Sequence, residues 1–225
     1  MTGLAWRWIG FHILAFGLHS LAASCIGSME SVYGDAGTSA SSLTGNVLAY
    51  AVLPILVATA QVLALAGNGF PIRPILWFLV TIVGISLGFR VSEDVIGPAF
   101  HLIARPLIKS TAHLMSAAMY SVWAVVFVTQ GAVLALAQGV PLLFRVTRPL
   151  SMLWAVSVLG AWSIAQGVDY LVGQVTISVE ARLDPSVTLG EAIACLAGAA
   201  SCGASFAALL LPALRRLLAH RPLAA

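Results

Sequence analysis

The sequence predicts an all-α protein that crosses a membrane about six times. Hydrophobic residues make up 60% of the chain and charged residues only 8%, whereas soluble domains carry roughly 25% charged residues. The apolar residues gather in about six blocks, each near the length of a helix that spans a bilayer. The strands of a membrane barrel would alternate polar and apolar residues, and these blocks do not, so we expect helices.

The predicted spans cover residues 8–27, 47–66, 75–89, 114–137, 153–172 and 193–211. The third span is short unless it extends into its flanks. Residues 98–113, which contain Arg105 and Lys109, are too polar to cross a membrane and too apolar to leave it, and we expect them to form an interfacial segment at the outer surface. The remaining loops are short, so residues 1–225 are expected to form a single transmembrane domain.

The basic residues predict an orientation. With the N-terminus in the cytoplasm, seven basic residues fall on the cytoplasmic side and four on the outer side, as the positive-inside rule requires. The seven are Arg7, Arg73, Arg145, Arg148, Arg215, Arg216 and Arg221. We therefore expect both termini in the cytoplasm, and the arginine-rich, lysine-poor composition favours a bacterial inner membrane. Most of the tryptophans lie near span ends, which predicts interface anchors, with Trp162 as the exception.

An internal repeat is one interpretation of the chain. Glu30, Glu93 and Asp169 each lie near the end of an odd-numbered span, and each is followed by a glycine four positions later. Arg-Pro pairs follow the second and fourth spans at residues 73–74 and 148–149. A true repeat would give three helical hairpins in parallel orientation, with the three acids at matching depth. The other interpretation is that glycines end helices and that acids favour the outer water.

Polar groups within the spans are the candidate transport or ion-binding residues. Asp169 lies inside a span, where a charge is costly and usually functional, although a solvated helix end would explain it equally well. Glu93 and Glu30 share its expected depth. Gln130 belongs to a set of amides and hydroxyls that can either line a solute path or hydrogen-bond neighbouring helices. The other members of that set are Gln61, Thr129, Gln138, Ser163 and Gln166.

The sixth span has the clearest packing pattern. Small side chains predominate in residues 194–204, and pairs such as Ala197 with Ser201 and Gly198 with Cys202 lie four positions apart. This spacing lets another helix approach closely. We therefore expect this helix to lie at the centre of the bundle or to contact a partner subunit.

Other classes of function leave little trace in the sequence. No hydrolase, zinc-protease, nucleotide-binding or dinucleotide-binding motif is present, so we expect no enzyme. Cys25, Cys195 and Cys202 lack the spacing of a disulfide framework or zinc site. His19 and His113 are weak candidates for a haem-ligating pair, and we expect no metal or cofactor. The net charge of +3 is too small and scattered for nucleic-acid binding.

The favoured function is that of a non-catalytic integral membrane subunit of a larger transport, secretion or respiratory assembly. Its expected partners are the lipid bilayer and other membrane subunits or further copies of the chain. The alternative is an autonomous solute or ion transporter or channel that uses Asp169. A weaker alternative is a haem-binding electron-transfer subunit.

Overall fold

A computed structural model describes residues 2–32, 48–107, 112–180 and 188–219. Over these residues all the regular secondary structure is helical, and residues 66–73 and 144–147 form turns, which confirms the predicted all-α class. The main helices are α1 (Thr2–Val32), α3 (Leu53–Leu65), α4 (Pro74–Ala99), α5 (Ala112–Leu143), α6 (Arg148–Glu180) and α7 (Thr188–Ala219). A π-helical turn, η1 (Leu48–Val52), precedes α3, and two further turns, η2 (Phe100–Ala104) and η3 (Arg105–Leu107), follow α4.

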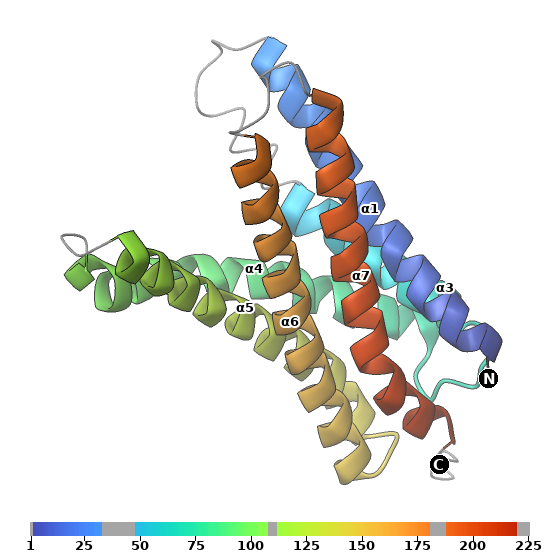
Figure 1. Cartoon of the computed structure of the whole chain (residues 1–225). Coiled ribbons are helices and arrows are strands. Elements are labelled where there is room, and N and C mark those ends of the chain that lie inside the picture. Colours follow the sequence, from blue (N-terminus) through green and yellow to red (C-terminus); the bar gives the residue numbers. More distant parts are fainter. Residues whose placement is uncertain (1, 33–47, 108–111, 181–187, 220–225) are drawn as a thin grey trace.

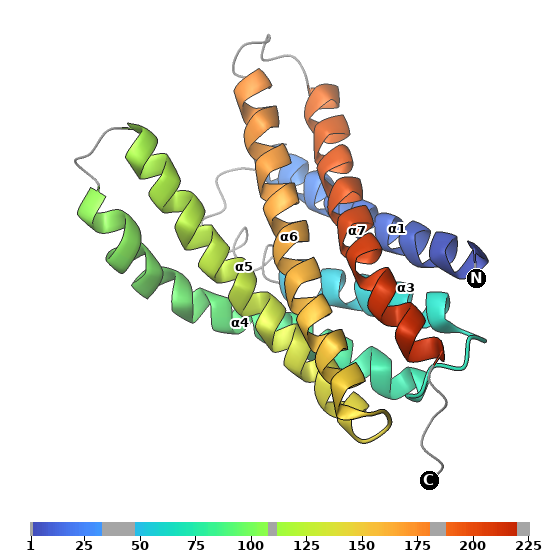
Figure 2. The same ribbon diagram turned by 60° about the horizontal axis from the view of Figure 1, so that its bottom comes forward.

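The six helices form a ring in the order of the sequence. Each helix packs against the next, and α7 packs against α1 to close the ring (Figure 1). The start of α1 and the end of α7 lie at the end of the molecule where α5 turns into α6. Toward the opposite end, α4 and α5 lean away from α6 and α7 (Figure 2). The arrangement therefore has a closely packed half and a splayed half.

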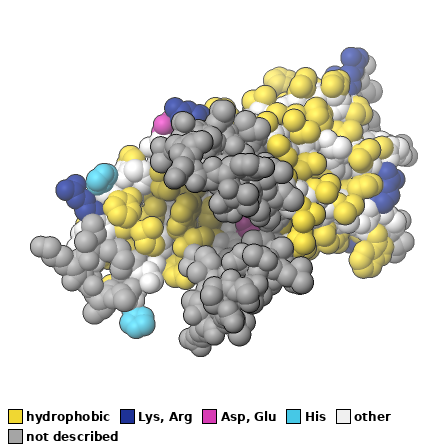
Figure 3. All heavy atoms as spheres, turned by 90° about the horizontal axis from the view of Figure 1, so that it is seen from above, with side chains coloured by type: hydrophobic (Ala, Val, Ile, Leu, Met, Phe, Trp, Pro, Cys, Tyr) yellow, Lys and Arg dark blue, Asp and Glu magenta, His cyan; other side chains and the backbone are white. Residues whose placement is uncertain are grey.

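Four described segments are long and apolar enough to cross a membrane: Pro74–Leu107, Ser116–Leu143, Arg148–Val172 and Leu196–Ala219. Residues Tyr50–Leu65 form a shorter apolar helix. Seen from above, hydrophobic side chains cover most of the described surface, and basic side chains lie at its margins (Figure 3). A surface of this kind suits lipid rather than water, and the chain is accordingly a multi-pass membrane protein.

Prolines and glycines set the helix boundaries at the closely packed end. Pro74 begins α4, and the Arg148–Pro149 pair begins α6; proline is tolerated in a first helical turn because its missing N–H has no partner there. Gly67 and Gly69 have φ values of 76° and 67° in the α3–α4 turn. These left-handed conformations favour glycine.

The third predicted span is longer than expected. It extends to residue 99 as α4 and to residue 107 through η2 and η3, so the expected interfacial segment begins as a continuation of this helix. Arg90, the first residue after the predicted span, lies on an exposed face and pairs with Glu93 and Asp94 one turn further along. The helix can therefore continue past these charges. Residues 108–111 lie outside the described residues.

The expectation that tryptophans anchor the span ends at the membrane interface is wrong for Trp8, Trp77 and Trp154. All three are 0% exposed, and Trp162 is 1% exposed. Each indole can be buried because its N–H donates a hydrogen bond. Trp8 donates to the Ala207 carbonyl at 3.1 Å, Trp77 to Gln61 Oε1 at 2.9 Å, Trp154 to Gln138 Oε1 at 3.2 Å and Trp162 to Gln130 Oε1 at 3.3 Å.

Gln61 and Gln138 are the centre of a buried hydrogen-bond network. Gln61 Oε1 accepts from Trp77 at 2.9 Å, from Gln138 Nε2 at 3.0 Å and from the Thr81 hydroxyl at 3.3 Å. Gln138 Oε1 in turn accepts from Trp154 on α6. The network joins α3, α4, α5 and α6. For these amides the observed role is hydrogen bonding between helices.

Glycines let the backbones approach at several crossings. A Cβ added to Gly203 would lie 2.6 Å from the His12 carbonyl oxygen, and one added to Gly131 would lie 2.9 Å from the Leu159 carbonyl oxygen. Both distances are too short for real atoms. The α1–α7 and α5–α6 contacts therefore require glycine at these positions.

Candidate functional site

A pocket of about 260 Å³ lies between η1, α4 and α5 in the splayed half of the molecule. We call it the Glu93 pocket. The lining residues of α4 are spaced three, four and seven positions apart, so they share one face of that helix. The lining residues of α5 have the same spacing and share one face of α5. The lining consists of Tyr50 from η1, Phe89, Ser92, Glu93 and Ile96 from α4, and Trp123, Val126 and Gln130 from α5. Two predicted transport candidates, Glu93 and Gln130, therefore meet here.

The polar side chains at the base of the Glu93 pocket are held in place from two sides. Trp162 on α6 donates to Gln130 Oε1 at 3.3 Å, and Gln130 Nε2 lies 3.1 Å from the Ser92 hydroxyl. Ser92 donates to the Phe89 carbonyl at 2.7 Å. Gln130 and Ser92 are 6% and 4% exposed. This chain of bonds fixes the amide and the hydroxyl in a single orientation.

Glu93 lies at the pocket rim within a small charged cluster. The Arg90 guanidinium lies 2.8 Å from Glu93 Oε2 and 4.0 Å from Asp94 Oδ1. One cation and two carboxylates leave the cluster with a surplus of one negative charge. All three side chains are substantially exposed, so the ion pairs contribute little to stability.

Tyr50 and aromatic rings form one wall of the pocket. The Ser86 hydroxyl donates to the Tyr50 carbonyl at 2.7 Å and so ties η1 to α4. The Tyr50 ring meets Phe89 edge to face, with 6.1 Å between ring centroids. The Tyr50 hydroxyl interacts with the Glu93 carboxylate, but its oxygen is buried and makes no hydrogen bond of good geometry.

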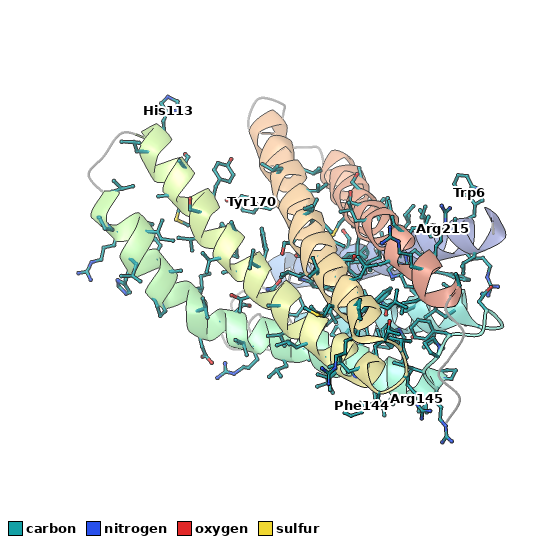
Figure 4. All side chains as sticks on the ribbon, turned by 90° about the horizontal axis from the view of Figure 1, so that it is seen from below. Trp6, His113, Phe144, Arg145, Tyr170 and Arg215 are labelled. Atoms are coloured by element: carbon teal, nitrogen blue, oxygen red, sulfur yellow. The ribbon has the colours of Figure 1, made fainter. Side chains whose placement is uncertain are left out.

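Two further pockets are mainly apolar. One, of about 220 Å³, lies between α5 and α6 and is lined by aromatic rings that include Tyr120, Trp123 and Tyr170. Tyr170 points from α6 toward α5 (Figure 4), where its ring centroid lies 5.6 Å from that of Tyr120. The other, of about 200 Å³, adjoins the α3–α4 turn beside Phe70 and Trp77. Neither is lined by a charged residue.

Asp169 does not line the Glu93 pocket. Its carboxylate lies beside α7, where a Cβ added to Gly198 would be 3.3 Å from Asp169 Oδ1, and it interacts with Cys202. The structure therefore separates Asp169 from Glu93 and Gln130. The Glu30 side chain lies outside the described residues, so the expected matching depth of the three acids stays a prediction.

The small residues of α7 divide between two faces. Gly198 and Cys202 are buried against α6, where a Cβ on Gly198 would lie 3.2 Å from Val172 Cγ1. Ala197 and Ser201 are exposed. The sequence indicated one close-packing stripe, and the structure has an inward pair and an outward pair.

The histidines considered for haem do not meet. His113 lies at the tip of the α4–α5 hairpin (Figure 4), whereas His19 is on α1, and within the described chain α1 and α5 make no contact. His12 is buried between Trp8 and Phe206, with ring centroids at 4.5 and 5.4 Å, and its Nδ1 lies 2.7 Å from the Trp8 carbonyl oxygen. Among the described residues, no group of three or more His, Cys, Asp or Glu side chains is placed to hold a metal.

Tyr50, Ser92 and Trp123 are site residues that the sequence did not identify. The spacing offered a partial signal, because Ser92 adjoins Glu93 and Trp123 lies two turns before Gln130. Tyr50 had no such signal, since it reaches the pocket from a different hairpin. The lining contains no lysine, histidine or cysteine, and its carboxylate, hydroxyls, amide and rings suit ligand binding.

Comparison with known proteins identifies no relative: no family model, no curated protein and no solved structure matches this chain.

Proposed function

We propose that this chain is a non-catalytic integral membrane subunit of a larger transport, secretion or respiratory assembly. The observation that carries the proposal is the outward face of α7. Ala197, Ser201 and Ala208 are exposed there, and Ser205 between them is half-buried. Their spacing of three or four residues makes a continuous strip of small side chains along one side of the helix.

This strip is distinct from the contacts that build the fold. α7 packs against α1 at Gly203 and against α6 at Gly198. Its contacts within the fold therefore use residues other than those of the outward strip. Helices in lipid associate through close van der Waals packing, which small residues permit. The outward strip therefore supports contact with a helix of another membrane subunit or of a second copy of the chain.

We also propose six membrane spans, in three parallel hairpins, with both termini in the cytoplasm of a bacterial cell. The topology supports this, because α1, α4 and α6 start at the same end of the ring and α3, α5 and α7 finish there. Arg145 and Arg215 lie at this end (Figure 4). Arg7, Arg73 and Arg148 stand near helix ends on the same side, in the direction of the positive-inside rule.

The test of the subunit proposal is substitution on the outward strip. Ala197→Leu adds bulk where a partner helix would pack, and we expect it to release co-purifying subunits while the protein remains folded. Val156→Leu is the control, because Val156 is 66% exposed on α6 and its change enlarges an exposed apolar side chain on a different helix. Equal partner recovery from both variants would contradict the proposal.

A second candidate function is solute or cation transport, and the Glu93 pocket favours it. In this second proposal the binding groups are Glu93 and Gln130 rather than Asp169, because the first two line the same pocket and Asp169 does not. In proteoliposomes, Glu93→Gln should then abolish uptake and Asp169→Asn should not. Uptake that survives Glu93→Gln would remove this candidate.

A further inference from the structure

We propose that the Glu93 pocket binds a small organic ammonium ion, a primary or a methylated amine. The inference concerns binding at the pocket. It shares this pocket with the transport candidate, but it does not require that the ligand cross the membrane.

The charge of the rim favours a cation. Arg90 occupies Glu93 Oε2, and a carboxylate has about four acceptor positions on its two oxygens. The Tyr50 hydroxyl also interacts with this carboxylate, so Arg90 and Tyr50 together still leave acceptor positions on Glu93 for a positively charged group. Arg90 also lies within 4.0 Å of Asp94, so it keeps an anionic partner if a ligand draws Glu93 away. An anionic ligand would have to approach a cluster that already carries surplus negative charge.

The aromatic wall favours an organic cation. Tyr50, Phe89 and Trp123 contribute rings to the same pocket as the carboxylate. The faces of aromatic rings attract ammonium groups, with a contribution that rises when the site is shielded from water. Aromatic rings with one nearby anion are the usual surroundings of a bound methylated ammonium.

The base of the pocket distinguishes this ligand from a metal ion. A hard cation such as Ca²⁺ takes six to eight oxygen ligands, whereas Glu93 is the one carboxylate in the lining. The Ser92 hydroxyl and the Gln130 amide are already engaged with each other and with Phe89 and Trp162. The remaining surface is apolar, with Ile96 and Val126, and suits the methyl or methylene groups of an amine. A volume of about 260 Å³ is sufficient for a small amine, since a cavity of about 150 Å³ holds a six-carbon ring.

The test is titration of the purified full-length protein, in mild detergent, with methylammonium chloride and tetramethylammonium chloride by calorimetry. Sodium chloride and potassium chloride at matched ionic strength are the comparison ions. We expect saturable binding of at least one ammonium ion and none of the metal ions. Glu93→Gln should weaken the binding by about tenfold or more, equivalent to the loss of roughly 1.4 kcal/mol. Asp169→Asn is the matched control, because it also removes one acidic charge and Asp169 does not line the pocket.

Variants of Trp123 separate ligand recognition from a folding defect. Trp123→Leu removes the aromatic face and should weaken ammonium binding severalfold, whereas Trp123→Phe should restore most of it. The thermal unfolding midpoint of each variant shows whether the fold is retained. Equal affinity of wild type and Glu93→Gln, equal binding of sodium, or loss of affinity in Trp123→Leu that Trp123→Phe does not restore would overturn the proposal. Ammonium binding without uptake would leave it intact and remove only the transport candidate.

Discussion

Gln61 connects three helices through one oxygen atom. Substituting it with leucine removes an acceptor of Trp77, Thr81 and Gln138. Thr81 and Gln138 keep a second acceptor, whereas the buried Trp77 indole N–H is left without a partner. We expect Gln61→Leu to reduce the free energy of unfolding by about 1–3 kcal/mol, measured by thermal unfolding in a single detergent.

The matched control for Gln61→Leu is Thr129→Val. The Thr129 hydroxyl donates to the Val125 carbonyl of its own helix at 2.8 Å, so its loss breaks no bond between helices. We expect its unfolding midpoint to stay close to that of the wild type. Equal destabilisation by both substitutions would mean that the glutamine network does not hold the helices together.

Asp169 provides a second prediction at the residue scale. Because its carboxylate lies beside Gly198 and Cys202 rather than in the Glu93 pocket, Asp169→Asn should leave ammonium affinity within about twofold of wild type. Calorimetry on the variant checks this. A loss comparable to that of Glu93→Gln would place Asp169 in the binding site after all.

Individual site residues were only partly predictable from the sequence. Glu93 and Gln130 stood out because polar groups are rare in these spans. Tyr50 and Trp123 did not stand out, because an aromatic residue has the same appearance in a sequence whether it faces lipid, a pocket or the core. The burial of Trp8, Trp77 and Trp154 depended on acceptors supplied by other helices, which no single span reveals.

At the scale of elements, α7 combines two roles that substitutions can separate. Gly203→Leu places a side chain against the His12 carbonyl, where even a Cβ would lie 2.6 Å away, so α1 and α7 must move apart. We expect a clearly lower unfolding midpoint for Gly203→Leu, with a cost of at least about 1–3 kcal/mol from overpacking. Ala197→Leu on the exposed face should unfold like the wild type. Equal midpoints for Gly203→Leu and wild type would contradict the α1–α7 contact.

The helices themselves were the most predictable level, because long apolar runs in lipid must satisfy their own backbone groups. The positions at which the helices end were less predictable. The third span was predicted to end at residue 89 unless it extended into its flanks, and the helix continues to residue 107. Three charged residues follow that position, and their side chains pair with one another on an exposed face, so the helix continues past Arg90, Glu93 and Asp94.

At the scale of the whole molecule, sequential packing makes a ring whose described centre is filled by indoles and amides. The ring order follows from short connections between neighbouring helices, which a sequence can suggest. The splay of α4 and α5 from α6 and α7 (Figure 2) could not be predicted, since it depends on crossing angles set by glycines and large rings. That splay leaves room for the Glu93 pocket on one side of α5 and the aromatic pocket on the other.

The measurement that tests the subunit proposal most directly is extraction at native expression level in a mild detergent, followed by mass spectrometry of the intact particle and its components. The account predicts a stoichiometric partner that is retained in Val156→Leu and lost in Ala197→Leu. A lone monomer, or a homo-oligomer unchanged by Ala197→Leu, would contradict it and make an autonomous transporter built around the Glu93 pocket the better account.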